Sequence, residues 1–178
     1  MGEFAERLTL LTIRADSPDG RLTGRLTGRL DTQITIQPDT YRTYADADLG
    51  HQLAQLAAVL FSRYRRAYDE VTASYRDGPP APYDQPEDVL FRDRRSALVA
   101  RGSSPLGRIE VTSRGLVRWT VTVTPGTVRT LPEAEFLTEV DGLTADILRD
   151  WRHKVILLAD EVYGIGVPAS LRTGGGPR

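Results

Sequence analysis

The sequence predicts an α+β protein made of two repeats of one unit, each a three-stranded antiparallel sheet followed by a long amphipathic helix. Three observations lead to this fold class. The chain repeats itself at a constant offset of 87 positions. In each copy, a stretch of alternating apolar and polar residues predicts strands. A following stretch with an apolar residue every three or four positions predicts a helix.

The repeat is clearest at residues that are identical in the two copies. Ser17-Pro18-Asp19-Gly20-Arg21 has the counterpart Ser104-Pro105-Leu106-Gly107-Arg108, and the offset then holds without a gap. Further identical pairs at the same offset are Gly28/Gly115, Thr35/Thr122, Pro38/Pro125, Arg42/Arg129, Leu56/Leu143 and Arg65/Arg152. Because chance does not produce such a run in one register, we interpret the chain as a duplicated supersecondary unit.

The amino-acid composition excludes several classes of protein. A chain of 178 residues with a net charge of −1 is not a strongly basic DNA-coating protein, although a local basic patch remains open. The absence of cysteine excludes disulfides, thiolate metal sites and a cysteine nucleophile. No signal-peptide pattern appears, and no apolar run approaches the roughly 20 residues that span a bilayer. We therefore expect a soluble, cytoplasmic protein with no membrane partner.

The first copy is predicted to begin with three strands. Residues 8–15 are mostly apolar and rich in threonine, which predicts the first strand. Ser17-Pro18-Asp19-Gly20 predicts a tight turn, because proline presets φ and glycine tolerates positive φ. Residues 21–37 alternate, and Thr27-Gly28 in their middle predicts the hairpin between the second and third strands.

A long helix is predicted from Asp46 to about residue 75. Its apolar stripe is formed by Leu49, Leu53, Leu56, Leu60, Tyr64 and Val71. At 3.6 residues a turn, this helix has about seven or eight turns. We expect it to extend past its own sheet and to meet a partner.

The predicted domain organisation is a first unit at 1–76, a linker at 77–88, a second unit at 89–164 and a disordered tail at 165–178. The linker is expected to be stiff and extended because it holds four prolines. The tail contains three consecutive glycines.

The second unit repeats the plan of the first. Its first strand is predicted at 96–101, and its helix from Glu133 to about Tyr163, where Gly164 stops it. Thr130 and Glu133 have the spacing of a capping box. In the first unit, residues 2–7 are expected to be too few for a stable helix before the first strand.

This arrangement of strand, turn, hairpin, proline and long helix resembles the YbaB/EbfC nucleoid-associated family, actinobacterial type. The first copy carries the resemblance through Ser17 to Arg21, Gly28, residues 30–38, Tyr41 and the helix from Asp46. The second copy carries it through Ser104-Pro105, Gly107-Arg108, Gly115, residues 117–125 and the helix from Glu133. Together these segments cover most of the chain outside the linker and the tail.

The resemblance implies a small α+β protomer that dimerises, with helices that project like tweezers and with DNA binding in the best-known members. Two copies in one chain then form an intramolecular, YbaB-like pseudo-dimer. Some actinobacterial relatives are accessory proteins of type VII secretion systems, which implies a protein partner instead. The chain departs from the family in its near-neutral charge and in the missing long N-terminal helix of the first copy.

No constellation of catalytic residues can be assembled from the sequence. His51 and His153 lie at non-equivalent positions of the two copies, and no Ser/His/Asp set, zinc-ligand spacing or phosphate-binding loop is present. Asp46, Asp48, Glu133 and Glu135 suit the first turns of helices, where carboxylates complement the helix dipole. We therefore expect a non-enzymatic protein with no catalytic residue, no metal and no cofactor.

The candidate DNA-binding residues are arginines of the polar strand faces. Arg21, Arg25 and Arg29 share one face of the first sheet, and Arg108, Arg114 and Arg118 share the corresponding face of the second. Six phosphate contacts would give salt-sensitive affinity without base specificity. The alternative is an ordinary solvated sheet whose charge is balanced by acidic residues such as Asp31 and Glu110.

Two further surfaces are candidates for binding. The helix residues Arg63, Arg65 and Arg66 form a second basic cluster, for which an ordinary solvated helix face is the alternative. Apolar residues towards the helix ends suggest a partner surface, unless they seal the two units against each other.

The leading hypothesis is a nucleoid-associated protein that binds duplex DNA. The rival is a protein-binding accessory factor, linked to specialised secretion. Further homo- or hetero-oligomerisation is left open by the sequence.

Overall fold

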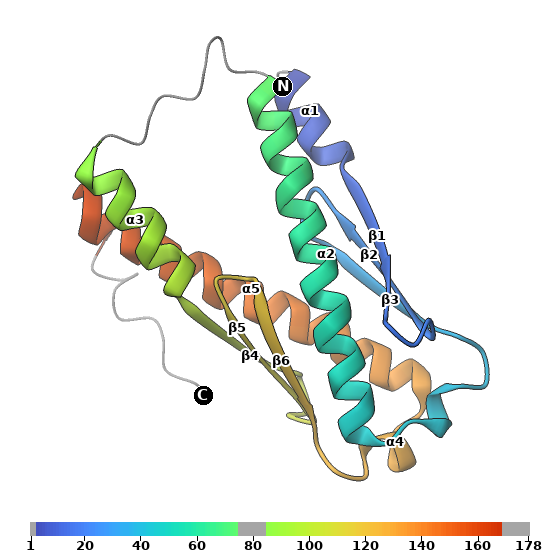
Figure 1. The fold of residues 1–178 in the computed structure, drawn as a ribbon. Helices are drawn as coiled ribbons and strands as arrows, with labels where there is room; N and C mark the ends of the chain where they lie inside the picture. Colours follow the sequence, from blue (N-terminus) through green and yellow to red (C-terminus); the bar gives the residue numbers. More distant parts are fainter. Residues whose placement is uncertain (1–2, 75–84, 169–178) are drawn as a thin grey trace.

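The structure, a computed structural model, describes residues 3–74 and 85–168, and it is an α+β fold of two similar units (Figure 1). The first unit consists of α1 (Glu3–Leu10), β1 (Thr12–Asp16), β2 (Leu22–Thr27), β3 (Thr32–Ile36), the 3₁₀ turn η1 (Tyr41–Thr43) and α2 (Asp46–Ser74). The second consists of α3 (Pro86–Ala97), β4 (Val99–Ser103), β5 (Ile109–Arg114), β6 (Arg118–Val123), α4 (Thr127–Thr130) and α5 (Glu133–Tyr163). The predicted fold class is confirmed.

The two sheets share one topology. Each is antiparallel, with strand orders β1-β2-β3 and β4-β5-β6. Register is shared as well, since Leu22 pairs with Ile36 and their counterparts 87 positions on, Ile109 and Val123, also pair. Alternation places Leu22 and Leu26 of β2 inside with Arg25 outside, as a half-buried antiparallel sheet requires.

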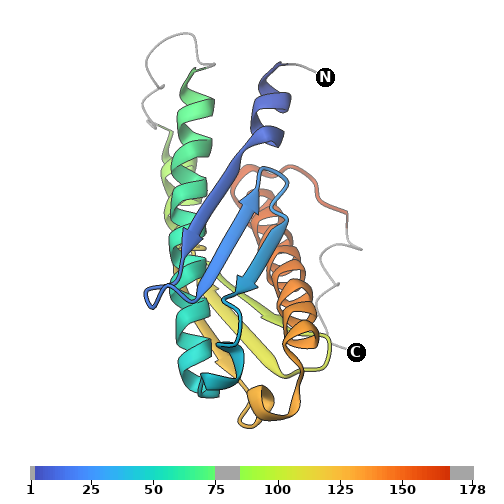
Figure 2. The ribbon, with the colours of Figure 1, turned by 90° about the vertical axis from the view of Figure 1, so that its right-hand side faces the viewer.

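The long helices interlock the two units. Helix α2 packs on β1 and β2 of its own sheet and on β6 of the other, while α5 packs on β4 and β5 of its own and on β3 of the other. The sheets therefore lie on opposite sides of the helix pair: in Figure 2 the first sheet is in front of the two helices and the second sheet is behind them. One buried cluster runs through both units, so each apolar stripe is covered by two sheets.

Polar contacts between the units reinforce this apolar interface. The Tyr41 hydroxyl donates to the carbonyl of Leu131 over 3.1 Å. The Arg42 guanidinium donates to the carbonyls of Val128 and Arg129. Water would replace these hydrogen bonds if the units separated, so each contributes only the net value of about 0.5–1.5 kcal/mol to holding the units together.

The tight turns that precede β2 and β5 are built alike. Ser17 Oγ accepts the N–H of Leu22, and Ser104 Oγ accepts the N–H of Ile109, over 2.9 and 3.0 Å. Gly20 and Gly107 have φ of 70° and 66°, which a side chain would strain. The predicted turn is confirmed in both copies.

The prediction for the chain before β1 was wrong. Leu8 to Leu10, which we expected to begin a strand, form the last turn of α1, and β1 begins only at Thr12. Helix α1 packs against α2, and its end is fixed by the N–H of Gly28, which donates to Leu11 O over 2.8 Å. Tertiary contacts thus support a helix that is too short to be stable alone.

The boundaries of the second unit differ in detail. Ser96 and Ala97, predicted as strand, belong to α3, which ends at the position equivalent to the end of α1. The expected capping box is wrong, because Pro132 is the N-cap of α5 and Thr130 Oγ1 donates to Gly126 O instead. The predicted end of α5 is confirmed, with Gly164 in the left-handed conformation at φ 63°.

Parts of two predicted segments lie outside the described residues. These are 75–84, which include most of the linker predicted at 77–88, and 169–178, which include most of the tail predicted at 165–178. Among the described helices, none is long and apolar enough to cross a membrane.

Candidate nucleic-acid interface

The candidate arginines occupy two separate surfaces, one on each sheet. Arg25 alternates with the buried residues Gly24 and Leu26 and therefore points away from the core. Arg114 and Arg118 point away from the core of the second sheet in the same way. Because the sheets lie on opposite sides of α2 and α5, the two sets form a pair of patches that face apart (Figures 1 and 2).

Arg21 and Arg108 are held at equivalent places beside the starts of the long helices. The Arg21 guanidinium donates to Thr43 Oγ1 over 3.4 Å, and that of Arg108 donates to Thr130 Oγ1 over 3.3 Å. Arg21 also lies over the ring of Tyr44, 5.7 Å from its centroid. The hydroxyl partners are neutral, although the Asp19 carboxylate lies close enough to Arg21 for the charge of Arg21 to help lower the pKa of Asp19.

Cross-strand neighbours increase the positive charge of both patches. Arg25 lies opposite Arg14 of β1, and Arg114 lies opposite Arg118. Like charges in direct cross-strand register destabilise a sheet by a few tenths of a kcal/mol. The sequence did not indicate Arg14 as a candidate, because residues 8–15 alternate poorly as a whole. The shared parity of Thr12, Arg14 and Asp16 was the available signal.

None of the six candidate arginines forms an ion pair with a described residue. Ion pairs within the described part of the chain lie elsewhere, and they include Arg66–Glu70, Arg92–Asp93, Arg94–Glu161, Arg149–Asp146 and Lys154–Asp150. Acidic residues such as Asp31 and Glu110 share these surfaces without contacting the arginines. The patches therefore hold positive charge that no carboxylate of the described chain neutralises directly.

Arg29 does not lie on the sheet face, contrary to the prediction. Strand β2 ends at Thr27, so Arg29 belongs to the hairpin turn, which Leu30 closes with φ of 66°. Its side chain faces α5 and lines a groove together with Arg149 and Arg152. Its exposure agrees with the parity, but alternation alone does not show that β2 ends before Arg29.

The second basic cluster is partly engaged in structural contacts. Arg63 donates to the carbonyl of Arg14 over 2.7 Å and so satisfies an acceptor of the edge strand β1. Arg66 is paired with Glu70. Arg65 is exposed on the same helix. Since two of its three members have partners, this cluster is a weaker site for phosphate than the sheet faces.

Asp19 and Tyr44 form the titratable pair nearest to Arg21. Although burial alone would raise it, the pKa of Asp19 is lowered by hydrogen bonds from the Ser17 and Tyr44 hydroxyls and from the N–H of Arg21. Burial and the hydrogen bond to Asp19 raise the pKa of Tyr44. The second copy has Leu106 and Leu131 at these positions, so this hydrogen-bonded pair exists in one copy only.

The two histidines do not indicate a catalytic or metal-binding site among the described residues. His51 is exposed on α2 and His153 is half-buried on α5. Among the described residues, no group of three or more His, Cys, Asp or Glu side chains is placed to hold a metal ion.

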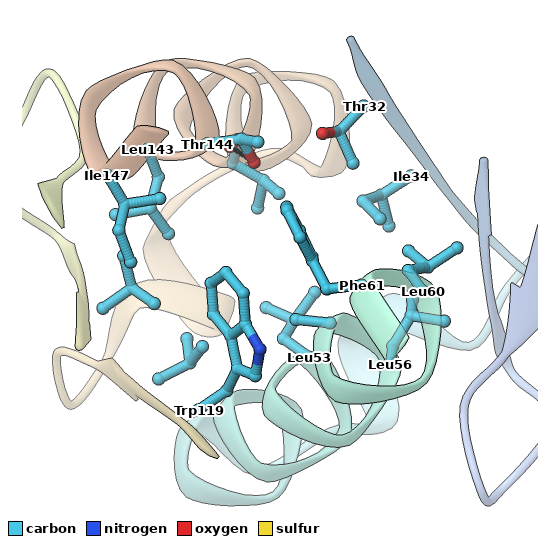
Figure 3. A pocket seen from close by; sticks show the side chains of 14 residues that line it. Thr32, Ile34, Leu53, Leu56, Leu60, Phe61, Trp119, Leu143, Thr144 and Ile147 are labelled. Atoms are coloured by element: carbon cyan, nitrogen blue, oxygen red, sulfur yellow. Dashed lines mark hydrogen bonds between the residues drawn. The ribbon is translucent and has the colours of Figure 1, made fainter. Parts of the chain in front are cut away.

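A small apolar cavity lies at the centre of the molecule, between both sheets and both long helices (Figure 3). Its volume is about 50 Å³. Two equivalent residues line it, Thr32 of β3 and Trp119 of β6, and both Thr32 Oγ1 and Trp119 Nε1 are buried without a hydrogen-bond partner. The cavity is well below the 300–1,000 Å³ of typical ligand pockets, so we do not consider it a site for an organic ligand.

Comparisons with known proteins do not identify a family for this chain. No protein-family model matches the sequence, and neither the curated proteins nor the solved structures provide a match. Function is therefore inferred from the residues and geometry of the chain itself.

Proposed function

We propose that this protein binds duplex DNA without reading its bases and without catalysing a reaction, as a pseudo-dimer of the YbaB/EbfC nucleoid-associated type. One observation supports the proposal most strongly: both outer sheet faces carry arginines whose guanidiniums form no ion pair with a described carboxylate, and two cross-strand pairs place like charges opposite each other. Anionic phosphates would relieve this repulsion. The proposal places the protein in the cytoplasm, on the nucleoid.

The arrangement favours phosphate contacts over base contacts. Guanidiniums on short three-stranded sheets can reach the DNA backbone, while neither long helix is presented for insertion into a groove, because each packs on both sheets. Affinity should then fall steeply with salt, with a logarithmic slope of about −0.9 for each phosphate neutralised. Two patches that face apart would allow one chain to contact two duplex segments.

A gel shift at about 50 mM and about 200 mM salt tests the proposal. We expect the folded protein to retain duplexes of unrelated sequence equally at the lower salt concentration and to release them at the higher. No retention at the lower salt concentration, with micromolar protein, would refute DNA binding.

Arginine variants test whether the two sheet-face patches are the surfaces that bind DNA. Arg14→Ser with Arg25→Ser, and Arg114→Ser with Arg118→Ser, should each weaken binding uniformly across sequences and reduce the salt slope by about one per arginine removed. Arg66→Ser is the control: it removes one positive charge, where each double variant removes two, from an exposed position that is already paired with Glu70. Equal effects of the control and of either double variant would show that net charge acts, rather than these patches.

The alternative is a protein-binding accessory factor, for example of a type VII secretion system, and exposed apolar side chains support it. On the arm formed by α3 and α5, Leu90, Ile156 and Tyr163 are 48%, 44% and 43% exposed. A chain that binds no DNA would leave this arm as the surface to test, by substituting Leu90 and Ile156 with Ser and measuring association with candidate partner polypeptides.

A further inference from the structure

A groove between the β2–β3 hairpin and α5 distinguishes one half of the molecule from the other. Its volume is about 480 Å³, and its walls combine Arg29 of the hairpin with Asp141, Arg149 and Arg152 of α5. Thr32 and Leu148 also line it. This size is within the range of pockets that hold small organic ligands.

The equivalent place in the other half is filled by two aromatic side chains. Trp119 stands at the position of Thr32, 87 residues on, and Phe61 stands 87 residues before Leu148. Their ring centroids are 4.7 Å apart, with an interplanar angle of 36°. Small side chains at Thr32 and Leu148 therefore leave open, in one copy, the space that an indole ring and a phenyl ring occupy in the other.

The rim of the groove differs in charge as well as in shape. Arg29 and Arg149 replace Leu116 and Ser62 of the filled copy, and Arg152 matches Arg65. Arg149 and Arg152 are three residues apart on α5 and so share one helix face. Arg149 pairs with Asp146 over 3.0 Å, but neither Arg29 nor Arg152 forms an ion pair with a described residue.

The apolar and acidic residues of the groove further restrict the chemistry of a ligand that could bind there. Leu30, Ala145 and Leu148 supply apolar surface, and the buried Oγ1 of Thr32 lacks a partner. Asp31 and Asp141 also line the groove, and Asp146 pairs with Arg149, so the positive charge that remains available to a ligand is that of Arg29 and Arg152. Burial raises the pKa of Asp141, as expected of a carboxyl that no guanidinium stabilises.

We propose that this groove binds a small aromatic anion. The ring lies over Leu148 in the space that corresponds to the Trp119 indole, and the carboxylate or phosphate of the ligand contacts Arg149 and Arg152, with Arg29 closing the opposite rim. The site is distinct from the sheet-face patches and does not require that the protein bind DNA.

Titration of the full chain by calorimetry tests this, with indole-3-acetate, phenyl phosphate and inorganic phosphate as probes. We expect saturable binding of one molecule per chain for an aromatic probe, and at least tenfold weaker binding of inorganic phosphate. Whichever aromatic probe binds more tightly identifies the anionic group. Absence of saturable binding for both aromatic probes at millimolar concentration would overturn the proposal.

Two kinds of variant locate the site. Thr32→Trp restores the filled state of the other copy and should abolish binding, while Arg149→Ser with Arg152→Ser should weaken it at least tenfold. Arg66→Ser, on α2, should leave it unchanged. Retained affinity in a folded Thr32→Trp protein, or in the double arginine variant if Thr32→Trp does not fold, would contradict the assignment. The DNA gel shift of Thr32→Trp should equal that of the unmodified protein, which separates the two proposals.

Discussion

The carboxylate of Asp46, the first residue of α2, accepts a hydrogen bond from the main-chain N–H of Val128 over 2.8 Å, although the two residues belong to different units. Its other oxygen accepts the N–H of Gly126 over 2.7 Å. One side chain thus begins the long helix of the first unit and holds the loop that precedes α5 in the second. An aspartate in the first turn of a helix is normally explained by its favourable interaction with the helix dipole. The carboxylate of Asp46 in addition holds a loop of the other unit.

Asp46→Ala should therefore destabilise the whole chain. It leaves two partly buried N–H groups without an acceptor, which costs about 1–3 kcal/mol. Urea unfolding followed by circular dichroism measures the loss. Asp48→Ala is the control, because Asp48 lies in the same first turn, is exposed and forms no hydrogen bond with a described residue. Equal midpoints for the two variants would show that the contacts between units contribute nothing.

Gly50→Ala should also destabilise the protein, although an alanine within a helix is about 1 kcal/mol more favourable than a glycine. A Cβ atom at Gly50 would lie 2.7 Å from the carbonyl oxygen of Val121, so α2 would have to move away from β6. The unfolding midpoint should fall. Ser62→Ala, at an exposed position of the same helix, should leave it unchanged or raise it. A more stable Gly50→Ala protein would mean that α2 does not approach β6 so closely.

Trp119→Thr should open a second groove at the cost of stability. The substitution removes the contact with Phe61 and part of the wall of the central cavity, which we expect to cost about 2–4 kcal/mol. Val117→Thr, two residues away and exposed, should cost less than about 0.5 kcal/mol. Thermal unfolding of both variants measures the difference, and comparable losses would argue against a structural role for the ring pair.

Stability should depend on pH through Asp19. Folding lowers the pKa of Asp19 below its ordinary value of 3.8. The contribution of Asp19 to the free energy of unfolding is therefore complete above pH 3.8, and it is lost as the pH falls through the lower pKa of the folded state. Asp19→Asn should thus reduce stability at pH 7 by about 0.5–1 kcal/mol and have a smaller effect near pH 3. Denaturant unfolding at the two pH values tests this. Asp69→Asn, whose carboxylate forms no hydrogen bond with a described residue, should have little effect at either pH.

Much of the fold could be predicted from the sequence, because both the alternation of the strands and the helical spacing of apolar residues are clear. The apolar stripe of α2 indicated the start at Asp46, and Gly164 indicated the end of α5, since a left-handed residue stops a helix without strain. The start of β1 could not be predicted in the same way. Leu8 to Leu10 have no helical signal of their own, and the contact of α1 with α2 decides their conformation.

The candidate surfaces were less predictable than the fold. Alternation placed Arg25, Arg114 and Arg118 correctly on polar faces. It misplaced Arg29, because the same parity continues from β2 through the turn into β3 and so does not show where β2 ends. The groove beside α5 depends on which side chains of one copy meet those of the other. A pattern within a single segment does not contain that information.

The covalent join between the two halves has a consequence for how this molecule can change. In a symmetric dimer of identical chains, every substitution alters two places at once, so a change that helps one site is also imposed on its twin. Here, tryptophan at 119 and threonine at 32 are inherited separately, as are leucine at 106 and aspartate at 19. One half can keep its packing while the other acquires a new surface.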